Sequence, residues 1–145
     1  MTRKQTCIES IPIVISSQLA ELSKVESLSE QVSDKMGFTQ DEKDNLAIAI
    51  TEVVGNAIVH GNGMNPDKRV HIAFHLYHDR LHVEVQDEGE GFNPDEVADP
   101  LDPENLMKES GRGIFILKNL IDGVDFEFSE TGTKVHLLLI KKSGT

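Results

Sequence analysis

The segment EVVGNAIVHG at residues 52–61, followed by DEGEG at 87–91 and GRGI at 111–114, carries most of the structural information in this chain. In the first segment Glu52 and Asn56 are one helical turn apart, so a carboxylate and a carboxamide share one side of a helix. The other two segments have closely spaced glycines, where a backbone can approach a ligand without side chains in the way. Each segment alone is a weak motif. Together and in this order, they predict one pocket for ATP held with a divalent metal.

Hydrophobic spacing predicts two amphipathic helices before the first glycine segment. Apolar residues recur at steps of three and four from 15 to 36, and the spacing ends near Gly37. A second helix with a buried apolar face is expected over 46–58. Thr39 and Glu42 have the spacing of a capping box in front of it.

Alternating apolar and polar residues predict the strands. A hairpin is expected from residues 69–77 and 81–85, and a closing hairpin from 124–129 and 134–140. A short strand at 7–11 and a third helix at 114–121 complete the pattern. The order strand, helix, helix, hairpin, loop, helix, hairpin predicts an α+β two-layer sandwich, with helices on one face of a mixed, mostly antiparallel sheet.

Size and composition limit the classes of protein. The 145 residues fit a single domain, 1–145, and the 38% hydrophobic and 27% charged content is that of an ordinary folded chain. A net charge of −11 makes direct nucleic-acid binding unfavourable, because such a surface repels phosphate backbones. One cysteine excludes an internal disulfide. No apolar run suits a signal peptide or a membrane span, so a cytoplasmic location with no membrane contact is expected.

The first segment has side chains suited to metal binding and base catalysis. Mg²⁺ prefers oxygen ligands and usually takes one or two from protein, so the carboxamide oxygen of Asn56 fits this role. Glu52 fits a general base that orients or deprotonates an attacking hydroxyl. His60 follows one turn later, so the three side chains would line one side of the helix beside its apolar stripe. For such a pair in isolation, the alternative is a solvated polar edge.

The second segment follows the end of a predicted strand. Asp87 could accept a hydrogen bond from an exocyclic amine, which would select adenine over guanine. Gly89 and Gly91 follow immediately. Without the neighbouring motifs, the segment would be an acidic turn after a strand.

The third segment opens a helix directly. Gly111 and Gly113 would expose backbone N–H groups at the helix N-terminus, a ready site for phosphate oxygens. Arg112 could add a charged contact to the polyphosphate or to a partner's phosphoacceptor. The alternative is an ordinary glycine loop with a surface arginine. Thr133, in the last hairpin, could place a hydroxyl near the base edge, but a tight turn explains it equally well.

These segments resemble the N box and the two glycine boxes of the GHKL ATPase superfamily, which includes gyrase, Hsp90, histidine kinases and MutL. The resemblance spans nearly the whole chain and implies the Bergerat fold of that superfamily. It is strongest for the small anti-sigma factor serine kinases of the RsbW and SpoIIAB type. Residues 52–61 are very similar to their N box, and residues 110–115 and 117–122 are similar to their second glycine box and the helix after it.

Roles follow from the resemblance by position. It implies Glu52 as the general base, Asn56 as the Mg²⁺ ligand and Asp87 as the adenine contact. It also implies that residues 93–110 form an ATP lid. The remaining positions implied for nucleotide contact are His60, Gly89, Gly91, Gly111, Arg112, Gly113, Ile114 and Thr133.

The resemblance also implies an activity and partners. Such proteins bind ATP or ADP with Mg²⁺, phosphorylate a serine on a STAS-domain anti-sigma factor antagonist, and as homodimers hold a sigma factor inactive. Two alternatives stay open: a binding module that needs ATP but transfers little or no phosphate, and a stand-alone catalytic domain like that of sensor histidine kinases. The intact Glu52 argues against the first. The absence of histidine among the first 59 residues argues against the second.

Three histidines fall on the polar face of the first predicted hairpin: His71, His75 and His82. Alternation on a solvated sheet face accounts for them without a metal. No cysteine or carboxylate spacing indicates a closed site, so zinc is not expected there.

Overall fold

The computed structural model describes residues 6–89 and 113–142. Within them the elements are β1 (Glu9–Ser16), η2 (Leu19–Glu21), α1 (Leu22–Met36), α2 (Gln40–Asn56), η3 (Ala57–Gly61), β2 (Arg69–Leu76), β3 (Arg80–Gln86), α4 (Gly113–Leu120), β4 (Gly123–Ser129) and β5 (Gly132–Ile140).

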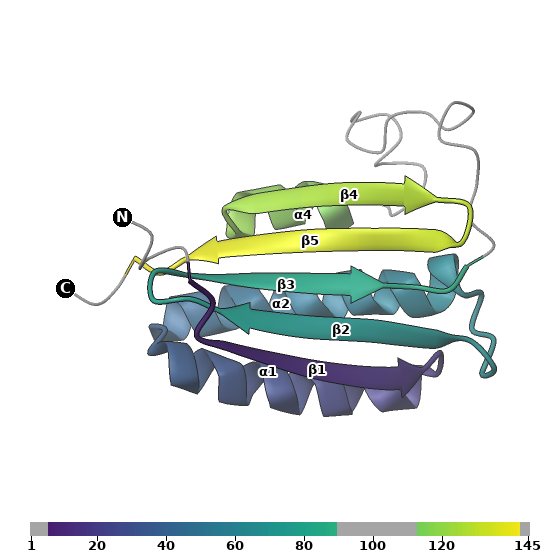
Figure 1. Ribbon diagram of the computed structural model, residues 1–145, viewed down its shortest axis with the longest axis horizontal. Coiled ribbons are helices and arrows are strands. Elements are labelled where there is room, and N and C mark those ends of the chain that lie inside the picture. Colours follow the sequence, from purple (N-terminus) through teal and green to yellow (C-terminus); the bar gives the residue numbers. More distant parts are fainter. Residues whose placement is uncertain (1–5, 90–112, 143–145) are drawn as a thin grey trace.

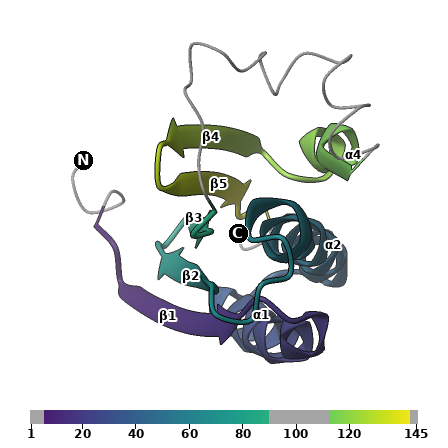
Figure 2. The same ribbon diagram turned by 90° about the vertical axis from the view of Figure 1, so that its right-hand side faces the viewer.

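The elements form two layers (Figure 1). The strands make one sheet in the order β1-β2-β3-β5-β4. Figure 2 shows α1, α2 and α4 on the same side of this sheet. These two layers confirm the predicted fold class, an α+β sandwich. Each pair of neighbouring strands in the sheet is antiparallel. No helix in the described part of the chain is long and apolar enough to cross a membrane.

The core lies between the sheet and the helices. Alternate residues of β2 and β3 are buried, so one face of each strand points toward the helices. Phe74 of β2, Val32 of α1, and Leu46 and Ile50 of α2 are all completely buried. Each such side chain contributes roughly 1.5–3 kcal/mol relative to its exposed state, so this core fixes where α2 runs beneath the sheet.

The junction between α1 and α2 matches the sequence signals. Gly37 has φ 69°, and its backbone N–H donates to the carbonyls at the end of α1. Such a left-handed residue commonly ends a helix. The Thr39 hydroxyl accepts from the Glu42 backbone N–H, and the Glu42 carboxylate accepts from the Thr39 backbone N–H at 2.8 Å. The predicted capping box is confirmed, and it sets where α2 begins.

The first strand is longer than predicted and begins later. β1 runs through Pro12 to Ser16 instead of ending before the proline. Pro12 is tolerated because β1 lies at the sheet edge and pairs with β2 alone. Ile15, whose spacing suggested the first helix, is instead a buried strand residue, and α1 starts at Leu22.

Candidate functional site

Glu52 and Asn56 lie side by side near the end of α2. The Asn56 Nδ2 donates to Glu52 Oε2 at 2.9 Å. Both side chains are half-buried, while Val53 and Val54 between them are buried in the core. The pair therefore lies beside the apolar stripe, as the spacing predicted. Because the amide nitrogen makes this bond, the Asn56 oxygen stays available as a ligand, and the second oxygen of Glu52 is free of this hydrogen bond and can take up a proton.

The helix changes its winding directly after Asn56. In η3 the backbone is a π-helix, and the Asn62 N–H donates to the Ala57 carbonyl at 2.8 Å, five residues back. Short π-turns occur frequently at functional sites. His60 is exposed here, and among the described residues no hydrogen bond joins it to Glu52 or Asn56. Its predicted contact with the nucleotide stays a prediction.

Asp87 is a buried carboxylate at the end of β3, with 7% of its surface exposed. Its Oδ1 accepts from the backbone N–H groups of Gly89 and Thr133, each at 3.0 Å. Its own N–H donates to the Thr133 carbonyl at 3.0 Å. Two backbone donors on one oxygen orient the carboxylate, and within the described part of the chain they leave Oδ2 without a backbone donor.

Two glycines outside the predicted set allow the backbone to close around Asp87. A Cβ on Gly61 would lie 2.2 Å from Asp87 Oδ2, and a Cβ on Gly132 would lie 2.4 Å from the Asp87 carbonyl oxygen. Gly132 also has φ 150°, which side chains disfavour. The π-turn thus brings the end of the first segment, Gly61, against the carboxylate of the second.

Asn62 supports this arrangement and was not among the predicted site residues. It is 3% exposed. Its Nδ2 donates to Ser17 Oγ at 2.7 Å and to the Arg69 carbonyl at 2.9 Å, and its Oδ1 accepts from the Glu88 N–H at 2.7 Å. The side chain therefore ties the ends of β1 and β3 to the start of β2.

Part of the predicted site can be located and part cannot. The structure brings Asp87, Gly89 and Thr133 into direct contact. Gly113 begins α4, as the helix-start prediction required. The positions Gly91, Gly111 and Arg112, the side chain of Ile114 and the expected lid at 93–110 lie outside the described residues.

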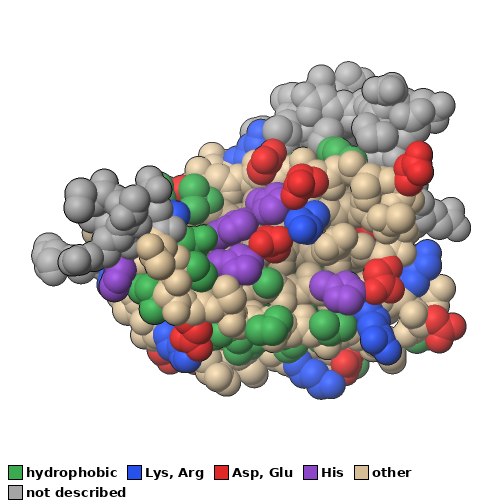
Figure 3. Space-filling model, in the orientation of Figure 1, with side chains coloured by type: hydrophobic (Ala, Val, Ile, Leu, Met, Phe, Trp, Pro, Cys, Tyr) green, Lys and Arg blue, Asp and Glu red, His purple; other side chains and the backbone are tan. Residues whose placement is uncertain are grey.

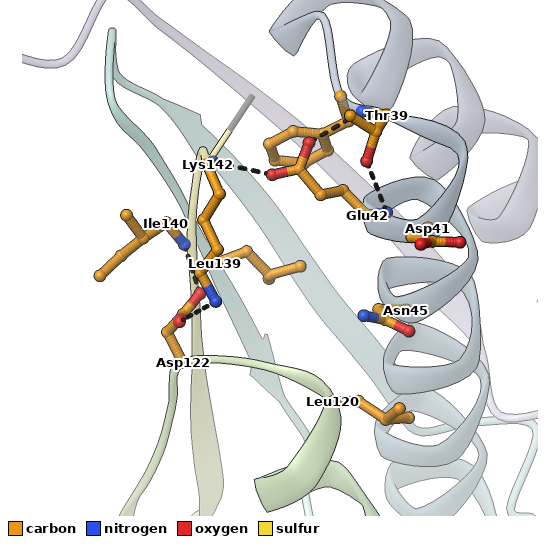
Figure 4. Close-up of a pocket in the computed structure, with 10 residues that line it drawn as sticks. Thr39, Asp41, Glu42, Asn45, Leu120, Asp122, Leu139, Ile140 and Lys142 are labelled. Atoms are coloured by element: carbon orange, nitrogen blue, oxygen red, sulfur yellow. Dashed lines mark hydrogen bonds and ion pairs between the residues drawn. The ribbon is translucent and has the colours of Figure 1, made fainter. Parts of the chain in front are cut away.

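A cavity of about 340 Å³ lies at the opposite end of the sheet, between the start of α2 and the ends of α4 and β5 (Figure 4). Three of its charged side chains, those of Glu42, Asp122 and Lys142, bond to the protein itself. Glu42 accepts from the N–H groups of Thr39 and Lys142. Asp122 accepts from the Ile140 N–H and pairs with the Lys142 ammonium at 3.0 Å. These contacts fasten β5 to α2, so we assign this region a structural role.

The fold and the Asp87 region define a class of protein. The family described as histidine kinase-like ATPase domain matches residues 15–139, and the chain belongs to this family. Its sequence relatives narrow the resemblance further. Serine-protein kinase RsbW of Bacillus subtilis is 34% identical over 99 residues, covering 64% of this chain and 62% of that protein. Anti-sigma F factor of Bacillus cytotoxicus is 36% identical over 104 residues, covering 68% of this chain and 70% of that protein.

The chain spans less than two thirds of the length of some curated relatives: 62% of the B. subtilis protein and 63% of RsbW from Oceanobacillus iheyensis. Solved structures support the fold. A Mycobacterium tuberculosis protein with RsbU and RsbW domains matches with a TM-score of 0.68 at 16% identity, over 94% of this chain and 34% of that one. The histidine kinase domain of Erythrobacter litoralis EL346 matches with a TM-score of 0.55 at 19% identity, over 86% of this chain and 61% of that one. The GHKL resemblance is thereby confirmed, and membership implies that the chain uses a nucleotide.

Proposed function

We propose that this chain is an ATP-dependent protein-serine kinase that also acts as an anti-sigma factor. The observation that carries the proposal is the contact between Asp87 and Gly61. It joins a buried carboxylate suited to an adenine amine to the segment that carries Glu52 and Asn56. The names of the relatives, serine-protein kinase and anti-sigma F factor, support the same reading.

Each predicted site residue has a role in this proposal. Asp87 Oδ2 accepts from the adenine amine, while Gly89, Gly91 and Thr133 shape that side of the pocket. Asn56 contributes its oxygen to Mg²⁺, and bound Mg-ATP supplies the phosphoryl group. The phosphates are assigned to Gly111, Arg112, Gly113 and Ile114, with His60 beside the nucleotide and residues 93–110 as the lid.

Glu52 acts on the protein substrate. The Asn56 Nδ2–H holds one carboxylate oxygen, Oε2, so the other can take the proton of a serine hydroxyl. The serine oxygen would then bond to the γ-phosphorus of ATP as the bond to the β,γ-bridging oxygen breaks and ADP leaves. The hydrogen bond from Asn56 also fixes the carboxylate rotamer. A base held this way needs little reorganisation in the transition state.

The partners in the proposal are proteins. The serine belongs to a STAS-domain anti-sigma factor antagonist, and a sigma factor is the competing partner held by a homodimer of this chain. The net charge of −11 suits these roles better than nucleic-acid contact.

The decisive experiment is a transfer assay with γ-labelled ATP, Mg²⁺ and a STAS-domain protein encoded by the same genome. We expect acid-stable serine labelling with the wild type. Glu52→Gln should lower the transfer rate by about 10²–10⁴-fold, the usual contribution of a general base. ATP binding should persist in that variant, because a base acts in the transition state. Glu30→Gln, at an exposed glutamate of α1, is the matched control and should transfer normally.

Other results would redirect the assignment. ATP binding without transfer to any candidate would favour a binding module that uses the nucleotide only to hold its partner. Acid-labile labelling of a histidine would favour a histidine-kinase-like catalytic domain. Failure to bind ATP would overturn the proposal.

A further inference from the structure

A cluster of histidines lies on the face of the sheet opposite α1, α2 and α4. His75 of β2 pairs directly with His82 of β3, and Glu84, two residues further along β3, pairs with His136 of β5. Residues two apart on a strand share a face, so the four side chains meet over the middle of the sheet. Figure 3 views this face and shows histidine side chains gathered near its centre.

The side chains contact one another closely. His75 Nε2 lies 2.7 Å from Glu84 Oε1, and the rings of His75 and His82 have centroids 5.3 Å apart. One possible ligand atom from each of His75, His82 and Glu84 lies within 4.8 Å of the other two. The His75 and Glu84 side chains are only 22% and 25% exposed. Lys134 contacts Glu84 through the other carboxylate oxygen, Oε2, at 3.3 Å.

We propose that His75, His82 and Glu84 bind a divalent transition-metal cation of the zinc class. Two imidazoles and one carboxylate are an established ligand set for zinc, with water completing the tetrahedron. Ligand atoms around one such ion lie roughly 3.5 Å apart, given metal–ligand distances of about 2.0–2.2 Å. The three candidate ligand atoms now lie within 4.8 Å of one another, so side-chain rotation on binding must close the remaining distance. Strand alternation alone did not predict this site, because it does not reveal the register that pairs His75 with His82.

Partners behind the ligands fix which ring nitrogen can bind. In the neutral tautomer of His136 that donates from Nε2 to Glu127, Nδ1 is an acceptor. His136 Nδ1 then accepts from His82 Nε2 at 2.9 Å, so the lone pair of His82 lies on Nδ1. On the other side, Ser10 Oγ lies 2.8 Å from His75 Nδ1, so Nε2 is the nitrogen that faces the site. Outer partners of this kind orient metal-binding histidines.

The test is calorimetric titration of Zn²⁺ into tag-free, chelator-treated protein with excess Mg²⁺ present. We expect one Zn²⁺ per chain and a rise in melting temperature on binding, since a ligand of the folded state stabilises it. His82→Gln and Glu84→Gln should each weaken Zn²⁺ binding by at least about 100-fold, beyond the 10–100-fold typical of losing an outer partner. His71→Gln is the matched control, because His71 shares this face but bonds Glu88 instead.

The outcomes distinguish a specific Zn²⁺ site from nonspecific Zn²⁺ binding by surface histidines. Loss in both cluster variants, with His71→Gln unchanged, supports the proposal. Circular dichroism of the metal-free variants should match the wild type, because all these residues lie on the outer face. Absence of Zn²⁺ binding by the wild type overturns the proposal. Equal affinity in His82→Gln and the wild type, or equal losses in all three variants, also overturns it.

Discussion

The Asp87 region and the histidine cluster belong to the same sheet but are built in different ways. Backbone groups from β3, β5 and the end of η3 surround Asp87, and glycines let them approach. The cluster is made by side chains that touch across strands while the backbone beneath stays regular. A site built from backbone cannot adapt when one glycine gains a side chain. A site built from half-buried side chains can lose one member and leave the fold intact.

The largest expected effect therefore comes from Gly61→Ala. The new Cβ would lie 2.2 Å from Asp87 Oδ2, a distance that forces either η3 or the carboxylate to move. Overpacking of this kind costs about 1–3 kcal/mol of unfolding free energy. Because the displaced group is the proposed adenine acceptor, ATP binding should be lost as well. Urea unfolding and nucleotide titration measure the two effects.

Gly55→Ala is the matched control for that change. Gly55 lies in α2 just before the π-turn, and a Cβ there meets no atom within 4 Å. Alanine should stabilise the helix by about 0.5–1 kcal/mol and leave ATP binding intact. Similar losses from both substitutions would show that the region is intolerant for some reason other than contact with Asp87.

Asp87→Asn tests the carboxylate without changing its size. The amide oxygen can keep the bonds from Gly89 and Thr133, which places the NH₂ group where Oδ2 now lies. A donor would then face the adenine amine, so ATP affinity should fall about 10–100-fold, matching a cost of about 1–3 kcal/mol for an unpaired buried group. Preference for ATP over GTP should fall with it. Undiminished selectivity in a folded variant would mean that Asp87 does not contact the base, and Asp67→Asn serves as the exposed control.

Asn62→Ala tests whether the position of Asp87 depends on the hydrogen bonds that Asn62 makes to the neighbouring backbone. The substitution leaves the Glu88 N–H and the Arg69 carbonyl without their buried partner. We expect a loss of about 1–3 kcal/mol in urea unfolding and a weaker affinity for ATP. Asn65→Ala, which removes a hydrogen bond at an exposed turn, should have a much smaller effect. Unchanged nucleotide affinity in Asn62→Ala would show that the hydrogen bonds of Asn62 do not contribute to nucleotide binding.

The fold was predictable where local chemistry decides structure. The capping box at Thr39 and the glycine at 37 each specify a helix end within a few residues, and alternation over 69–76 specifies a strand. The structure of the N-terminal segment was not predictable in this way. Ile15 continues the helical spacing by coincidence, and only its pairing with β2 shows that it is a strand residue. The predicted strand ended before Pro12 for the same reason. A proline inside a strand is tolerated at a sheet edge, and the sequence does not show which strand lies at the edge.

The candidate site was likewise predictable only where a local motif determines it. Asp87 was predicted because its motif is local, but Gly61 and Asn62 gained their roles from a π-turn that the spacing did not reveal. For the cluster, alternation predicted that His75 and His82 share a face. It also puts Glu84 on that face, two residues from His82, but it could not place His75 opposite His82 or His136 opposite Glu84, since strand register is fixed by the buried face and not by the polar residues themselves.

The smallest expected effect is on the pH dependence of the unfolding free energy, which should distinguish the histidine cluster from the rest of the outer face. The pKa of His82 lies below its ordinary 6.5 in the folded protein, so the unfolded chain binds more protons just below that pH. Stability then rises with pH in that window and is lost as pH falls from 6.5 toward the folded pKa. The lowered pKa of Glu84 acts in a separate window, below 4.5. In metal-free protein, urea unfolding from about pH 7.5 to about pH 5 should show this slope, which His82→Gln should reduce and His71→Gln should retain. An equal slope in His82→Gln and the wild type would place the responsible group elsewhere.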